Sequence, residues 1–302
     1  MLKIPALFAL TLASLSTTPA EARQVRRLPA TGQWVVEYAD DSCRLAREFG
    51  DKDKRVTVIF EQFVPGDIFK LLFVGKMIRP QSNQSPIEAT VRFGPNEEAD
   101  DNRGSLATVG SVAALLLDGE QRLAPWSRAE DLVRKDASER NLPFDPAPLG
   151  TAREQAVTLL ELGKALPFDL VFETGPMDKP LDALRLCSWD TVKTWGLSIE
   201  EQKGLTREAF PIVPSRTWFS SDDYPGKMLR DGFEGNVNFR VIVNSSGAPI
   251  SCHVQSSTRP QEFDDVVCRQ VMKQAKFHPA LDASGKPIKS YYRQSVQFRI
   301  GQ

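Results

Sequence analysis

The feature that most constrains this chain is a pair of alternating apolar segments near its C-terminus. Between residues 237 and 243 every second side chain is apolar: Val237, Phe239, Val241 and Val243. This period of two predicts a strand with one buried face. Ser245-Ser-Gly247 predicts a turn, after which Ile250, Cys252 and Val254 share one face of a second strand. Two such strands need other elements to cover their common apolar face.

The segments on either side of these two strands are predicted to cover their apolar face. Residues 223–230 predict a short helix that ends at Gly232, and residues 261–276 predict a longer one. The longer helix has an inward stripe at helical spacing: Phe263, Val267, Val271 and Ala275. After a turn at residues 284–287, a third predicted strand places Tyr292, Val296 and Phe298 on one face. Residues 222–302 therefore predict helix-strand-strand-helix-strand, a three-stranded antiparallel sheet with two helices.

Residues 23–203 predict a separate, mixed α+β domain, and residues 204–221 predict a linker. Strand-like segments come first: Trp34–Tyr38, Val56–Glu61, Ile68–Val74 and Ile87–Phe93. The acidic segment 95–104 is predicted to be an exposed loop, and Val112–Leu117 a core segment. Helix starts follow, as three capping boxes and an Asp-Lys-Pro start: Ser127–Glu130, Thr151–Glu154, Ser198–Glu201 and Asp178–Pro180. No functional site is evident in this domain.

The first 22 residues predict a cleaved signal peptide. Lys3 precedes an apolar run from Ile4 to Leu15, and Ala20-Glu21-Ala22 gives the small-x-small pattern of a cleavage site. A bilayer span needs roughly 20 apolar residues, and this run is shorter. The alternative is an uncleaved anchor. We expect an exported, periplasmic protein without a membrane span after cleavage.

Four cysteines follow this segment: Cys43, Cys187, Cys252 and Cys268. An even number in an exported chain favours disulfides over thiol chemistry. Four cysteines allow three connectivities. Cys252 and Cys268 lie in one compact segment and form the natural local pair, which leaves Cys43 for Cys187. None forms a Cys-x-x-Cys motif, so redox and zinc sites are disfavoured.

Charge and histidine content exclude several functions. Lys plus Arg number 38 against 39 Asp plus Glu, so no basic excess is available to bind nucleic acid. The only histidines are His253 and His278, and no nucleophile-elbow motif accompanies them. They are predicted to be ordinary surface residues, and Asp40-Asp41 a solvated loop. Trp189 and Trp195 are predicted to be core and interface residues. We therefore expect no enzyme activity, no metal and no cofactor.

Spaced motifs in residues 222–302 resemble the TonB C-terminal domain. They are Tyr224-Pro225, Gly235 with Val237, Ser256-Ser257 and Phe277-His-Pro279-Ala280. Two small departures are Ser257-Thr258, where the family has Ser-Gly, and Phe263-Asp264, where it has Leu-Asp. The chain also lacks the N-terminal membrane helix and the Pro-rich spacer of energy-transducing TonB proteins, so coupling to a proton-driven motor does not follow.

The resemblance implies a binding module in TonB-dependent transport. In this family the domain captures an extended segment of an outer-membrane receptor by strand addition. The final strand, residues 291–300, is the predicted edge. Its candidate partner-binding residues are Tyr291, Arg293, Gln294, Ser295, Gln297 and Arg299.

Two alternatives remain open. The edge could be covered by the first domain or by a second copy in a homodimer. Residues 23–200 could instead be an enzyme or ligand-binding domain, with the TonB-like unit as a docking appendage. A deep polar pocket with convergent titratable groups would favour the latter.

Overall fold

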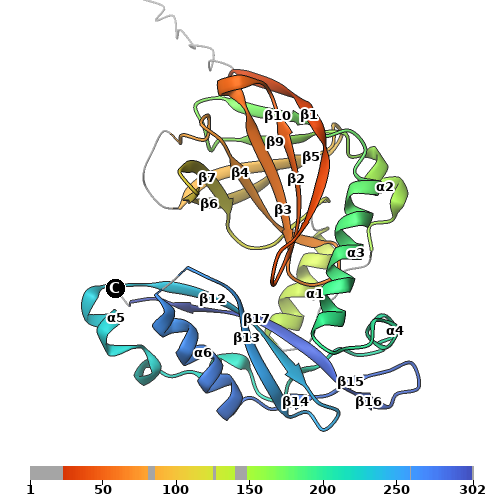
Figure 1. Cartoon of the computed structure of the whole chain (residues 1–302), viewed down its shortest axis with the longest axis vertical. Helices are drawn as coiled ribbons and strands as arrows, with labels where there is room; N and C mark the ends of the chain where they lie inside the picture. The colour runs from red at the N-terminus through yellow and green to blue at the C-terminus, as the bar shows by residue number, and fades with distance from the viewer. Residues whose placement is uncertain (1–22, 81–85, 125–126, 140–147, 259, 301–302) are drawn as a thin grey trace, which may run out of the picture.

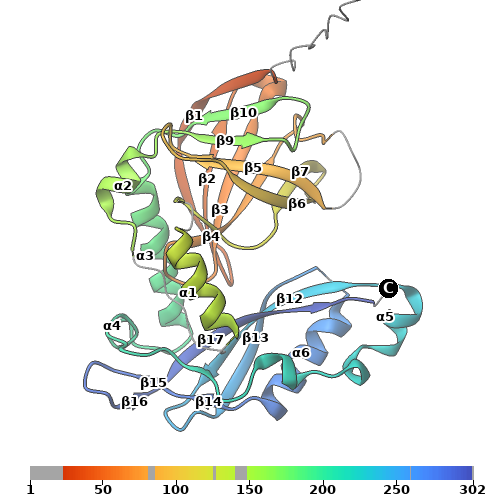
Figure 2. The same ribbon diagram turned by 180° about the vertical axis from the view of Figure 1, so that it is seen from behind.

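The computed structural model describes residues 23–80, 86–124, 127–139, 148–258 and 260–300. A β-barrel flanked by helices forms the N-terminal part, and a small sheet backed by helices lies against one end of it (Figures 1 and 2). The predicted signal peptide, residues 1–22, lies outside the described residues. No helix among the described residues is both long and apolar enough to span a membrane.

The N-terminal sheet closes on itself. Its ladder runs β3-β2-β1-β10-β9-β5-β6-β7-β4, and a β3–β4 pairing closes the nine strands, with β8 added beside β4. The strands are β1 Val25–Tyr38, β2 Cys43–Phe49, β3 Val56–Gln62, β4 Ile68–Val74, β5 Ile87–Phe93, β6 Asp100–Val109, β7 Val112–Leu117, β8 Gln121–Arg122, β9 Leu160–Gly163 and β10 Asp169–Glu173. The mixed α+β prediction is thus right in outline, but its sheet is a barrel. The predicted loop at 95–104 is wrong in its second half, because β6 begins at Asp100.

Phenylalanine side chains fill the barrel. Six of them are buried and meet mostly edge to face: Phe49, Phe60, Phe69, Phe73, Phe93 and Phe172. A barrel of this size has an interior just wide enough for side chains to fill. The interior is therefore a packed core.

Helices α2 Thr151–Ala156 and α3 Asp178–Thr194 lie along one side of the barrel (Figure 1). Helix α1 Arg128–Glu139 runs from the barrel toward the C-terminal sheet, and α4 Ile199–Lys203 lies beside the C-terminal domain (Figures 1 and 2). A short 3-10 helix, η1 Lys52–Lys54, lies between β2 and β3. Helix α3 buries Leu181, Leu184 and Cys187, and Cys187 forms the predicted disulfide with Cys43 on β2. This bond joins α3 to the barrel wall.

One of the three predicted capping boxes is borne out in full, and a second is borne out at its cap residue alone. Ser127 and Glu130 exchange both hydrogen bonds, and Ser198 accepts from the backbone N–H of Glu201. The box at Thr151 is wrong. Gly150 occupies the cap position there, and the Glu154 side chain is buried instead of reaching back.

The C-terminal order matches the prediction. Its elements are α5 Gly226–Asp231, β12 Gly235–Val243, β13 Pro249–Ser257, α6 Gln261–Gln274, β14 Phe277–His278, β15 Ala280–Leu281, β16 Pro287–Ile288 and β17 Ser290–Phe298. The main sheet is antiparallel in the order β13-β12-β17. The predicted inward residues of β12 and α6 form its core, and Cys252 pairs with Cys268 as predicted.

The segment 204–221, predicted as a linker, packs into this C-terminal fold. It holds β11 Phe210–Pro211 and the 3-10 helix η2 Ser215–Trp218, while η3 follows at Ser221–Asp223. Strand β11 pairs with β14, and Ala209 and Trp218 are buried in the C-terminal core. The connection is thus part of the domain that it leads to.

Gly247 marks a turn that only glycine fits. Its φ is +83°, and a Cβ there would collide with the carbonyl oxygen of Phe277. We expect Gly247→Ala to lower the free energy of unfolding by about 3 kcal/mol, since it combines backbone strain with a backbone clash. Gly232 is the matched control, because its φ is +75° with no atom within 4 Å of such a Cβ. Gly232→Ala should cost about 1 kcal/mol. Equal losses in urea denaturation would contradict this reading.

Candidate functional site

Strand β17 lies at an edge of the C-terminal sheet. It pairs with β12 from Gly235–Phe298 to Val243–Ser290, and no other strand of the described residues pairs with it. Such an edge presents unpaired N–H and C=O groups, to which an extended segment can add as a further strand.

The two faces of β17 have different surroundings. Tyr292 and Phe298 point to the helical layer, where Tyr292 meets the rings of Trp218 and Phe277, and Phe298 stacks on Phe263. The opposite face of the sheet turns toward the barrel and the C-terminal half of α3 (Figures 1 and 2). The first domain therefore covers part of this face, whereas the alternative concerned the edge of β17.

Two of the predicted partner-binding residues belong to this interdomain contact. The Tyr291 ring meets Trp195, at the end of α3, edge to face at 5.2 Å. Arg293 binds the carboxylate of Glu120, which lies between β7 and β8. Burial lowers the pKa of Arg293 to about 10. These two side chains are held by the first domain rather than turned to solvent.

The other four predicted residues lie farther along the strand or just beyond it. Gln294 accepts a hydrogen bond from the Tyr292 hydroxyl, and Ser295 donates to Asn238 on β12. Gln297 is exposed. Arg299 pairs with Glu234 at 2.8 Å at the exposed end of the sheet. The accessible part of the edge is thus its C-terminal half.

The interdomain contact also uses His253, which is exposed as predicted for a surface residue, and Asp41 of the predicted solvated loop. His253 Nε2 lies 2.7 Å from Asp41 Oδ1, so neither residue is an isolated surface group. Arg240 lies between them and the edge strand, because it is the register partner of both His253 and Arg293. His253, Arg240 and Arg293 thus form a row across the sheet. The sequence signal for this contact was the alternation of polar residues along the central strand β12, because the second face of that strand also has to be covered.

Arg240 is the most buried member of this row. Its guanidinium carbon lies 4.0 Å from the centre of the Trp195 ring, and its nearest carboxylate, Asp41, is at 4.0 Å. Burial lowers the pKa of Arg240 to about 10, and Asp41 opposes this shift. Its Nε and Nη1 atoms have no hydrogen-bond partner within the part of the chain that the structure describes. Together with a small apolar cluster of Val192, Leu197 and Ile242, this stack forms the centre of the interdomain contact.

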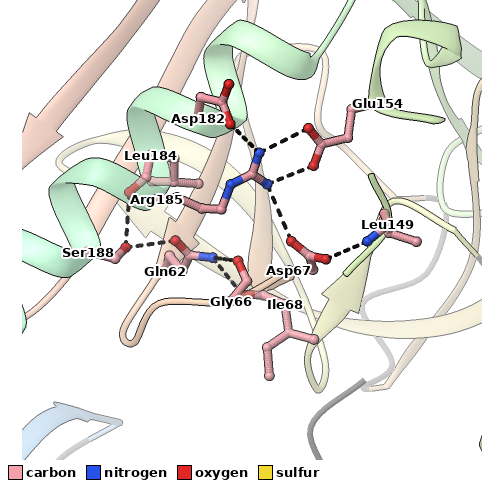
Figure 3. Close-up of polar contacts among 10 residues, drawn as sticks. All are labelled: Gln62, Gly66, Asp67, Ile68, Leu149, Glu154, Asp182, Leu184, Arg185 and Ser188. Atoms are coloured by element: carbon pink, nitrogen blue, oxygen red, sulfur yellow. Dashed lines mark hydrogen bonds and ion pairs between the residues drawn. The ribbon is translucent and has the colours of Figure 1, made fainter. Parts of the chain in front are cut away.

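A second polar cluster lies inside the first domain (Figure 3). Arg185 of α3 donates two hydrogen bonds to Glu154 of α2, at 2.7 and 3.0 Å, and contacts Asp67 and Asp182. The hydrogen bonds with Glu154 are the main cause that raises the pKa of Arg185 above its usual value. Asp67 also accepts from the Leu149 backbone N–H. The cluster ties the turn before β4 to α2 and α3.

The hollow beside this cluster is too small for a substrate. Its volume is about 10 Å³, roughly the room for one water molecule. The surrounding charges pair with one another, so they offer no free acid or base. Among the described residues, no group of three or more His, Cys, Asp or Glu side chains has an arrangement that could hold a metal ion.

Comparison with known proteins identifies one domain. Residues 221–300 match the family model described as Gram-negative bacterial TonB protein C-terminal. No curated protein matches the chain. The family is a transport-associated, non-enzymatic domain of the Gram-negative envelope. The resemblance carried by Tyr224-Pro225 and the motifs after it is confirmed, and residues 221–300 form a TonB C-terminal domain.

Proposed function

We propose that this protein is a periplasmic, non-enzymatic binding module that acts in TonB-dependent transport. Its partner is an extended segment of an outer-membrane receptor, which adds as a strand to the free side of β17. The observation that carries the proposal is the position of β17 at the edge of a TonB C-terminal sheet. The predicted signal peptide and two disulfides, which persist in oxidising compartments, support the periplasmic setting.

The partner would contact the exposed half of the strand most closely. There the backbone lies beside Gln294, Ser295 and Gln297, with Arg299 just beyond the strand. Main-chain hydrogen bonds supply affinity in strand addition, while alternate side chains supply selectivity. Tyr291 and Arg293 flank this region from the interdomain side.

The alternative of an enzyme or ligand-binding site in residues 23–200 receives no support from a specific observation. The barrel interior is packed with aromatic rings, and the described hollow beside Arg185 has about 10 Å³. We therefore propose no second function. A homodimer through the same edge is an outcome of the experiment below.

Proline substitution tests the edge. Gln294 and Gln297 differ in parity, so the N–H of one faces β12 and that of the other faces the free side. We expect Gln294→Pro or Gln297→Pro, whichever stays folded, to weaken binding of a synthetic receptor N-terminal segment at least tenfold, measured by fluorescence anisotropy. The other variant should lose stability, since it breaks a ladder hydrogen bond.

Alanine variants are the control for this test. Gln294→Ala and Gln297→Ala keep the N–H and remove only the side chain, so they should retain most of the affinity. Unchanged affinity in the folded proline variant would refute the proposed edge. A wild-type dimer that the same proline variant dissociates would show that a second copy occupies it.

A further inference from the structure

The hairpin of β6 and β7 ends in an exposed apolar tip, residues 106–112. Among the described strands, β5 pairs with β6 no further than Gly104, and β4 pairs with β7 no further than Ala114, so the turn extends past both neighbours. Three apolar side chains of the tip are well exposed: Leu106 is 44% exposed, Val109 47% and Val112 38%. They contact solvent rather than the barrel core.

The tip is apolar on both of its faces. Leu106 and Val109 are three residues apart in one strand and therefore point to opposite faces, while Val112 is the register partner of Val109. From Gly104 to Leu117 the sequence has no charged residue, and one arginine and one aspartate bound this run. Exposed strand edges usually carry charges that prevent association, and exposed apolar patches mark sites of contact. The uncharged tip therefore points to a contact of its own.

Two basic segments adjoin the base of this hairpin. The Gly75 N–H donates a hydrogen bond to the Ala113 carbonyl oxygen at 2.9 Å, and a Cβ on Gly75 would lie 2.5 Å from the carbonyl oxygen of Arg55. Lys76 pairs with Asp53 at 2.9 Å, so segments 51–55 and 75–79 lie side by side next to the hairpin. The exposed cations of the two segments form what we call the basic rim: Lys52, Lys54, Arg55, Lys76 and Arg79.

The basic rim has an excess of positive charge. The carboxylates of the two segments are Asp51 and Asp53, and Glu48 of β2 adds a third by pairing with Arg55 at 3.3 Å. The five cations of the rim thus meet three carboxylates, whereas the whole chain has a formal net charge of −1. A surface that fits this part of the barrel is therefore anionic where it meets the rim and apolar where it meets the tip.

A bilayer with anionic headgroups has this arrangement. We propose that the tip and the basic rim bind an anionic membrane surface, with the tip inserted at the boundary of headgroups and acyl chains and the rim held among the headgroups. A protein partner would need a recess shaped to a projecting tip, whereas lipid accepts apolar side chains on both of its faces.

This contact is separate from the proposed strand addition. Strand β7 has six residues and so runs about 20 Å from the tip before the chain reaches Glu120, which binds Arg293 of β17. The tip is therefore not part of the interdomain contact, and membrane binding goes beyond the proposed capture of a receptor segment. Each of the two can be tested without the other.

Vesicle binding by the mature protein tests the inference, because the apolar run in residues 1–22 is then absent. Co-sedimentation measures the partition coefficient with vesicles of phosphatidylcholine alone and of equal parts phosphatidylcholine and phosphatidylglycerol. We expect at least tenfold stronger binding to the anionic vesicles. Val109→Ser/Val112→Ser should lower this binding at least tenfold, since both valines lose their apolar surface. Val35→Ser, at a valine of β1 that is 62% exposed, should bind like the wild type.

A second pair of variants tests the charges. Lys52→Gln/Lys54→Gln should weaken binding to the anionic vesicles at least fivefold, because cations near an anionic surface contribute directly to binding. Lys273→Gln/Lys276→Gln removes the same charge from exposed positions of the C-terminal domain and should have little effect. High salt should weaken binding of the wild type, since it screens the headgroup charges.

Several outcomes would overturn the inference. If the wild-type protein does not bind anionic vesicles, the tip is not a membrane contact and a protein is its occupant. If folded Val109→Ser/Val112→Ser binds as well as the wild type, the contact lies elsewhere, and equal losses in the two lysine variants would exclude the basic rim. Affinity for a receptor peptide should stay unchanged in all of these variants, so failure of membrane binding and failure of strand addition are distinguishable.

Discussion

Removing the Cys43–Cys187 disulfide should lower the stability of the first domain by about 5 kcal/mol. The bond joins residues 144 positions apart, and in the chain-entropy model a loop of this length constrains the unfolded state by about that amount. Domains of ordinary stability unfold with about 5–15 kcal/mol. We therefore expect the Cys43→Ala/Cys187→Ala double variant to be close to unfolding at 25 °C.

Urea denaturation combined with hydrogen exchange measures this effect domain by domain. The Cys252→Ala/Cys268→Ala variant is the control, because its loop spans only 16 positions and should contribute about 3 kcal/mol, to the C-terminal domain. The loss in the first variant should appear as faster exchange in α3 and the barrel strands. Equal losses in the two variants, or a loss confined to the C-terminal domain, would contradict this expectation.

The Arg185→Met substitution should cost about 3–4 kcal/mol. Glu154 is only 3% exposed, so loss of the guanidinium would leave its carboxylate buried without a cation, and the half-buried Asp67 would lose the same partner. Breaking one side of a buried ion pair is costly, because the desolvated partner charge remains. Adding Glu154→Gln to Arg185→Met should recover part of the loss, since an amide is cheaper to bury than a carboxylate.

Arg103→Met is the matched control for this variant. Arg103 pairs with Glu88 at 3.2 Å, but both side chains are about two-thirds exposed. Exposed pairs contribute little, so we expect a loss below about 1 kcal/mol. If both variants lose the same stability in thermal or urea unfolding, the cluster around Arg185 is not the structural tie inferred from its contacts.

Local patterns predicted several strands and helices, but missed β2, β9 and β10 and did not predict the closure of the barrel. Ile68–Val74 and Ile87–Phe93 were predicted with the bounds of β4 and β5. Closure depends on β1 pairing with β10 through Pro29 and with β2 from Ala30 onward. It also needs the pairing of β3 with β4. Alternation along one strand records which side chains are buried, not which strand lies beside it.

Alternation was also too local to describe the surroundings of the candidate site. In β17 it correctly separated Tyr292 and Phe298 from Arg293. A polar face, however, has the same sequence pattern whether it contacts water or another domain. Glu154 was read as a capping residue because its neighbour in sequence is Thr151, whereas its true partner, Arg185, lies 31 residues away. Only the short spaced motifs of residues 222–302 carried information about long-range structure, through the family that they identify.

The folded connection between the two domains sets how far the TonB C-terminal domain can travel. Eighteen residues in extended form, the length of segment 204–221, could span about 60 Å. Here β11 and Trp218 of that segment are built into the C-terminal core, so this length is not available as a tether. Lys289 also donates a hydrogen bond to Gly196, just after α3, and Ser290 donates one to Gln202 of α4. The domain therefore cannot extend far from the barrel. In the proposed strand addition, the receptor segment has to come to a strand edge whose direction is set by the barrel.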